Sequence, residues 1–121
     1  MDKNDTAISQ VEFYELEKVR FIIKDGCGLD VAYAYDDLVF SEHGIFILQF
    51  VNSSTRSMDC WFNKDCIESD RLSLLKSLTN SANLNKIEIV YKGNFEMIQQ
   101  DGKEQIDIRF YWNKIAYKII S

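Results

Sequence analysis

The clearest pattern in this chain is a pair of apolar segments, separated by a short polar stretch, between residues 29 and 51. From Leu29 to Tyr35, large apolar residues alternate with acidic or small ones, a period of two that is typical of a strand with one buried face. After the polar residues 41–44, the segment 45–51 is apolar on both alternating sets, as expected for a strand covered on both faces. We therefore predict a hairpin at the centre of a sheet. Its buried residues are expected to be Phe46, Ile47, Leu48 and Phe50.

Further strands are predicted on both sides of this hairpin, because the period of two recurs between turn signals. The alternation at 19–24 runs into Asp25-Gly26-Cys27-Gly28, whose glycines suit a tight reversal, so this segment is expected to pair with the strand that starts at Leu29. Residues 11–16 fit either an irregular strand or a short helix, and Asp36-Asp37 indicates a bend. The other predicted strands are 58–62, 87–91, 95–99 and 106–112, with turns at 92–94 and 100–103 and a possible edge strand at 115–119.

One amphipathic helix is predicted after Asp65, which is followed three residues later by Glu68, as in a capping box. Apolar residues then recur at helical spacing, and the polar run 79–83 is expected to end the helix. Hairpins around one helix predict an α+β fold: a curved, mainly antiparallel β-sheet built from hairpins, with the helix packed on one face. A sandwich and a partly closed barrel are the alternatives. The helix residues expected to pack on the sheet are Leu74, Leu75 and Leu78.

Length and composition fit a single globular domain over residues 1–121, with roughly the first seven residues frayed. The chain is 46% hydrophobic and contains no apolar run approaching the ~20 residues of a membrane-spanning helix. Its polar start does not resemble a secretory signal, so we expect a cytoplasmic protein without a membrane partner. Three cysteines have no disulfide-framework spacing and are expected to be thiols, with a bond between the last two as the alternative. They are Cys27, Cys60 and Cys66.

Charge is the strongest compositional indication of a partner. Fourteen basic residues against nineteen acidic ones give a net charge of −5, which disfavours nucleic acid and favours a basic partner. Four carboxylates lie on or near the main hairpin, and they fit a solvated face, a surface for a protein partner, or a cation or acid–base site. Trp61, beside the polar loop 52–57, is a candidate interface anchor, whereas most aromatic residues are expected in the core. The four carboxylates are Asp30, Asp36, Asp37 and Glu42.

The sequence contains no specific catalytic or metal-binding motif. Cys27 between two glycines, with His43 and an aspartate, has the residue types of a nucleophilic relay, but nothing in the spacing requires one. The three cysteines and His43 lack the paired spacing of a zinc knuckle. The sequence therefore predicts no enzyme activity, no cofactor and no metal site.

A small acidic chain of mixed strands and one helix, with free cysteines and no catalytic motif, resembles the immunity proteins of bacterial toxin systems, especially those of contact-dependent growth inhibition. The resemblance implies a cytoplasmic protein that binds a cognate toxin domain tightly and blocks it. We accordingly expect an inhibitor of a basic toxin domain. Two alternatives are a small-molecule-binding or enzymatic curved-sheet domain, which needs a concave pocket with convergent polar groups, and an acidic nucleic-acid mimic. The expected partner-binding residues are Asp30, Asp36, Asp37, Glu42 and Trp61.

Overall fold

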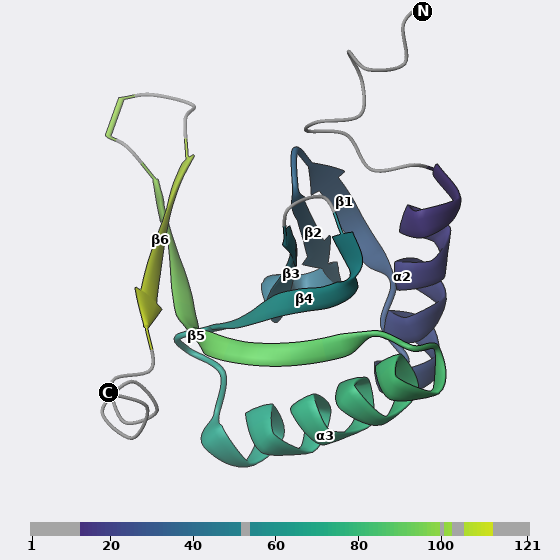
Figure 1. Ribbon diagram of the computed structural model, residues 1–121. Coiled ribbons are helices and arrows are strands. Elements are labelled where there is room, and N and C mark those ends of the chain that lie inside the picture. Colours follow the sequence, from purple (N-terminus) through teal and green to yellow (C-terminus); the bar gives the residue numbers. More distant parts are fainter. Residues whose placement is uncertain (1–12, 52–53, 100, 103–105, 113–121) are drawn as a thin grey trace, which may run out of the picture.

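The computed structural model describes residues 13–51, 54–99, 101–102 and 106–112 (Figure 1). The predicted frayed start and the predicted edge strand at 115–119 lie outside these residues. Two helices and a six-stranded sheet make up the described part, which confirms the α+β class. The elements are α2 (Phe13–Cys27), β1 (Val31–Tyr35), β2 (Leu38–Ser41), the short 3-10 helix η1 (Glu42–Gly44), β3 (Phe46–Val51), β4 (Ser54–Asn63), α3 (Glu68–Leu84), β5 (Glu88–Gln99) and β6 (Ile106–Trp112).

The six strands lie side by side in the order in which they occur in the chain, and the sheet curls (Figure 1). Four of the five neighbouring pairs are antiparallel, so the prediction of a curved, mainly antiparallel sheet is confirmed. β2 pairs with β3 through η1, but the predicted hairpin between 29–35 and 45–51 is wrong. The chain reverses at Asp36-Asp37, where we expected only a bend, so β1 pairs with β2 and is mostly exposed. β4 and β5 are parallel, because α3 carries the chain back between them.

Helix α2 replaces the strand that we predicted at 19–24, so the expected hairpin into Leu29 is wrong. The burial of this segment follows a helical spacing, with exposed Arg20 and Phe21 between buried Val19 and Ile22. A short apolar run fits both periods in the sequence, and here packing against a second helix decides the outcome. Gly28, with φ +72°, ends the helix, and its amide donates to the carbonyl of Lys24 at 2.9 Å. The buried residues of α2 are Val19, Ile22 and Ile23.

Both helices pack on one face of the sheet, and the main core lies between them and the strands (Figure 1). Phe46, Leu48 and Phe50 of β3 are buried there, whereas Ile47 is buried on the opposite face. The burial predicted for β3 is thus confirmed. The predicted helix residues also reach this core: Leu78 is fully buried, and Leu74 and Leu75 pack against it partly buried.

The two ends of α3 differ from the prediction. The helix begins after Ile67, which makes no side-chain capping bond, and the amide of Asp65 instead donates to the side chain of Asn63 at 2.9 Å. At its other end, α3 continues through the polar run 79–83 to Leu84. Ser81 is buried in this run, and its hydroxyl donates to Asp25 of α2 at 2.9 Å, so a contact between helices outweighs the local preference for a turn.

Strand β5 is continuous where a turn at 92–94 was predicted, and that prediction is wrong. Cys60 of β4 lies opposite Tyr91 and Trp61 lies opposite Gly93, so Lys92 is an extra residue in the ladder, as in a β-bulge. Gly93 takes a φ of 152°, which favours glycine. The second half of β5 continues away from the helices and pairs with β6 (Figure 1).

Gly26 is the point of closest approach between the two helices, and we expect Gly26→Ala to destabilise the protein. A Cβ at this position would lie 2.8 Å from the carbonyl oxygen of Ser77 and 3.3 Å from the Cα of Leu78, so the helices would have to separate. Alanine favours a helix by about 1 kcal/mol over glycine, but overpacking of this kind costs about 1–3 kcal/mol. Urea denaturation should therefore show a lower midpoint. Arg20→Ala, an exposed substitution in the same helix, is the control and should change stability by less than about 0.5 kcal/mol.

Candidate functional site

The face of the sheet opposite the helices carries a row of six residues, one from each strand. The strand registers bring them into line, since each residue of the row is paired with the next across the sheet. None of the described helices covers this face, which we call the helix-free face. Five members of the row are apolar or aromatic and one is glycine. The row consists of Tyr33, Phe40, Ile47, Trp61, Gly93 and Trp112.

The centre of the row is buried by neighbouring side chains, and its ends are exposed. Tyr33 stacks on Phe40 with ring centroids 4.4 Å apart, and Phe40 is only 3% exposed. Trp61, at 4%, contacts Phe110 at 4.7 Å and, edge to face, Trp112 at 5.6 Å. Tyr33 is 54% exposed at one end of the row and Trp112 is 59% exposed at the other. The helix-free face therefore has a packed centre, and its exposed aromatic side chains lie at the two edges of the sheet.

A chain of side-chain hydrogen bonds fixes the orientation of Trp61. Its indole N–H donates to Gln49 Oε1 at 3.2 Å, and Gln49 Nε2 donates to Asp37 Oδ2 at 3.1 Å. These bonds connect β4 and β3 to the turn between β1 and β2. The acidic turn and the aromatic row are thus parts of one packed unit.

A lysine and an aspartate lie next to the row. Asp59 is paired with Gln49 in the strand register, and burial raises the pKa of its carboxyl, an effect partly opposed by the positive charge of Lys92. Lys92, the extra residue of the β5 bulge, places its Nζ 5.2 Å from the centroid of the Trp112 ring. A cation is therefore held against an exposed indole, near a carboxylate.

The acidic residues predicted as one surface separate into two pairs at opposite ends of β2. Asp37 adjoins the helix-free face through its hydrogen bond from Gln49, and Asp36, with φ +59°, precedes it in the turn. Asp30 and Glu42 lie at the other end, on the order of 17 Å away for the five residues from Asp37 to Glu42. The four carboxylates thus lie along the hairpin as two pairs rather than one cluster, and their role in partner binding stays a prediction.

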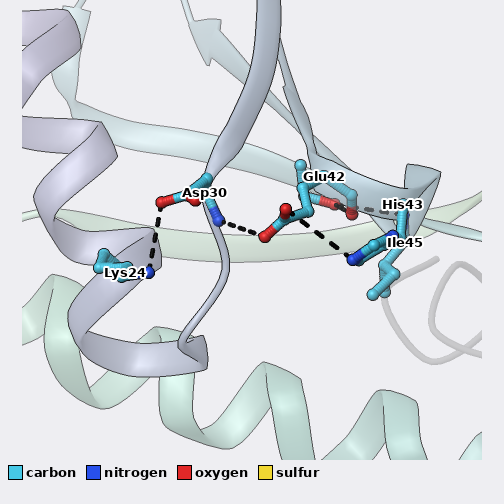
Figure 2. A network of polar contacts seen from close by, with 6 residues as sticks. Lys24, Asp30, Glu42, His43 and Ile45 are labelled. Carbon is cyan, nitrogen blue, oxygen red and sulfur yellow. Dashed lines mark hydrogen bonds and ion pairs between the residues drawn. The ribbon is translucent and has the colours of Figure 1, made fainter.

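Intramolecular contacts already occupy the second pair, as Figure 2 shows. Glu42 accepts the amide N–H of Asp30 at 2.9 Å and lies 3.8 Å from the imidazole of His43. Asp30 lies 3.4 Å from the ammonium of Lys24, which ties α2 to β1. Trp61, expected as a partly exposed anchor, is buried because Phe110 and Trp112 cover it. It supports the aromatic surface from below.

A hollow of about 560 Å³ lies where η1 meets the start of α3. Ile45, one of its lining residues, donates its amide N–H to the buried hydroxyl of Ser41 at 3.2 Å, and Phe46 donates to the same hydroxyl at 3.0 Å. His43 projects there from a left-handed backbone, with φ +65°. Polar and apolar side chains line this hollow, among them His43, Asn63, Asp65, Cys66, Asp70 and Leu74.

The thiols lack the environment of a nucleophile. Burial, reinforced by nearby Asp70, raises the pKa of Cys66, and burial raises the pKa of Cys27 to about 11. The Cys27 thiol instead donates to the carbonyl of Leu74 at 3.8 Å. Over the described ranges, no group of three or more histidine, cysteine, aspartate or glutamate residues is placed to hold a metal ion.

Comparison with protein-family models, with curated proteins and with solved structures found no match for this chain. Its function must therefore be argued from its own residues. Of the two helices that the structure describes, neither has the length and apolar character to cross a membrane.

Sequence reasoning did not find the helix-free face as a site. The alternation in 106–112 already placed Trp112 on the same face as Phe110. Gln49, Asp59 and Lys92 carried no signal of their own, because their proximity depends on strand registers and on the bulge at Lys92. The predicted turn at 92–94 would have separated Trp61 from Trp112.

The three cysteines are free thiols, and a thiol reagent should count three of them in denaturant without reductant. Cys60 is fully buried, so in the native protein it should react far more slowly than Cys66, which is partly exposed. A count of one would mean that a disulfide had formed and would contradict this structure.

Cys27 should also make stability depend on pH in the alkaline range. Its pKa is about 11 in the folded protein against 9.0 for an ordinary thiol, so the folded state holds the proton more tightly. The resulting stability is present below pH 9 and is lost as the pH rises through about 11. Urea midpoints should therefore fall from pH 8 to pH 10.5, and they should fall less steeply in Cys27→Ala. Equal slopes in the two proteins would contradict the assignment.

Proposed function

We propose that this protein is an immunity-type inhibitor that binds a cognate, basic toxin domain in the cytoplasm through its helix-free face. The observation that carries the proposal is the aromatic row, with a packed centre and exposed tyrosine and tryptophan at its ends. Exposed tyrosine and tryptophan side chains on a rigid base are typical of protein interfaces, where binding hot spots are enriched in these residues.

Charge supports a basic partner. The chain carries a net charge of −5, and Asp36 and Asp37 border the aromatic face. Carboxylates at the rim of an apolar surface attract a basic partner over a distance and accelerate association. Many nucleases that bind phosphate backbones are basic, which makes such a toxin domain a fitting partner.

Two of the alternatives, thiol-based catalysis and nucleic-acid mimicry, have less physical support. The raised pKa values of Cys27, Cys60 and Cys66 keep these thiols protonated at neutral pH, which disfavours nucleophilic catalysis. A nucleic-acid mimic needs a continuous array of carboxylates, but the acidic residues of the main hairpin separate into two pairs and the row between the sheet edges is aromatic.

Binding to the toxin domain encoded beside this chain's gene, measured by surface plasmon resonance at two salt concentrations, tests the proposal. Tyr33→Ala should weaken binding about 30-fold or more, the effect of losing a hot spot of about 2 kcal/mol. Asp36→Asn with Asp37→Asn should slow association and reduce its dependence on salt.

The second acidic pair provides a matched control. Asp30→Asn with Glu42→Gln removes an equal number of charges at the far end of β2, and with its fold verified by circular dichroism it should change association less than the first double variant. Equal effects would show that net charge alone matters and would remove the helix-free face as the binding surface. Binding to no neighbouring gene product would contradict the immunity function itself.

A further inference from the structure

The position of Lys92 shows how the helix-free face accommodates a cation. Because Lys92 is the extra residue of the bulge, it does not follow the regular alternation of β5, and its ammonium lies 5.2 Å from the centroid of the Trp112 ring. Asp59 lies two residues before Trp61 on the same face of β4, and the positive charge of Lys92 favours the charged form of its carboxyl. Trp112 and Asp59 are thus the two groups that interact with this positive charge.

The indole that receives this charge is held in place from below. Trp112 contacts Trp61 edge to face at 5.6 Å, and Trp61 is fixed by its hydrogen bond to Gln49. Gly93 lies between the two tryptophans in the register and adds no side chain there. The exposed ring is therefore oriented before any ligand arrives, which lowers the entropic cost of binding.

Lysine is a weak occupant of such a position. An ammonium is a strongly hydrated point charge, and a cation–π contact at an exposed site contributes only about 0.5–1 kcal/mol. A guanidinium is planar and less strongly hydrated, so it can stack on an indole while it donates hydrogen bonds to a carboxylate. Asp59 and Trp112 offer these two kinds of partner.

We propose that Trp112 and Asp59 form a subsite for an arginine side chain of the protein partner, and that Lys92 occupies this subsite in the free protein and leaves it on binding. The inference rests on the proposed function and names the chemical group that the basic partner inserts. Because the Lys92 ammonium competes with the arginine for this subsite, removing it should raise the affinity for arginine.

A single-residue probe tests the subsite without the partner. N-acetyl-arginine methylamide is titrated into the ¹⁵N-labelled full chain while the two indole N–H resonances are followed, with Trp112→Phe used to assign them. The Trp112 signal should shift in a saturable way, and Trp61 should shift less. The neutral isostere N-acetyl-citrulline methylamide should leave both signals in place, and the lysine analogue should bind more weakly than the arginine probe.

Two variants should change the affinity for the arginine probe in opposite directions. Lys92→Gln removes the competing charge and should tighten probe binding about two- to five-fold, the size of one exposed cation–π contact. Asp59→Asn should weaken it. The resonance dispersion of each variant shows whether the fold is intact, and Glu88→Gln, an exposed charge change on the same strand, should leave the affinity unchanged.

The arginine subsite is overturned if citrulline shifts the Trp112 signal as much as arginine, if lysine binds as tightly, or if Lys92→Gln fails to tighten binding. These outcomes differ from a failure of the proposed function. If the probe fails while the toxin domain still depends on Tyr33, only the subsite is wrong. If the probe binds and no toxin domain does, the subsite stands and the immunity function fails.

Discussion

Gly93→Val should lower the free energy of unfolding by about 2–5 kcal/mol, combining backbone strain with overpacking. Gly93 has a φ of 152°, which a β-branched residue adopts only with strain. Its place in the register is between Trp61 and Trp112, so a valine would also force these two rings apart. Chemical denaturation followed by circular dichroism gives the loss of stability, and the change in tryptophan fluorescence of the native state reports on the ring contact.

A control on the same strand separates these local effects from a general effect of valine. Glu88→Val places valine at an exposed position of β5, and it should change stability by less than about 0.5 kcal/mol. If Gly93→Val were as stable as the wild type, the two tryptophans would not be packed across Gly93. The helix-free face would then lack its rigid base.

Leu78→Ala should cost about 2–5 kcal/mol, the usual range for emptying a core leucine site. The Leu78 side chain is fully buried in the apolar core between the helices and the sheet, so its truncation would leave a cavity among apolar side chains. Denaturation in urea should show a lower midpoint with little change in slope.

Leu72→Ala is the matched control, because it makes the same chemical change in the same helix at a side chain that is 55% exposed. It should change stability by less than about 0.5 kcal/mol. Leu75→Ala, at a partly buried position, should fall between the two. Equal losses at Leu72 and Leu78 would contradict the orientation of α3 on the sheet.

The immunity-type proposal places partner binding on a face that the acidic residues alone did not identify. Asp36 and Asp37 remain part of the proposed interface because the hydrogen bond from Gln49 joins the acidic turn to the aromatic row. Asp30 and Glu42 serve the structure, since they join α2, β1 and η1. A mutation that combined all four would mix an interface effect with a folding effect.

The sequence by itself determined those elements whose apolar residues have one clear period. The alternation around Leu29–Tyr35, the doubly apolar β3 and the helical stripe through Leu78 each correspond to an element of the structure. Such periods are local, because they follow from the backbone geometry of the segment itself. They predicted the α+β class and the burial of β3 and of Leu78, but not the exposure of Tyr33, Tyr35, Tyr111 and Trp112, which we expected in the core.

Only the tertiary structure decided which segments lie beside one another and where the regular pattern breaks. Residues 19–24 fit two periods, and the packing of Val19, Ile22 and Ile23 against α3 and the sheet stabilises the helix. Residues 92–94 have the composition of a turn, but they continue β5. The bulge at Lys92 keeps both halves of this strand paired with their neighbours. The aromatic row depends on five strand registers at once, and a shift of one residue in any of them would turn part of it to the other face. No local pattern contains that information, since register arises from packing between segments that are distant in the chain.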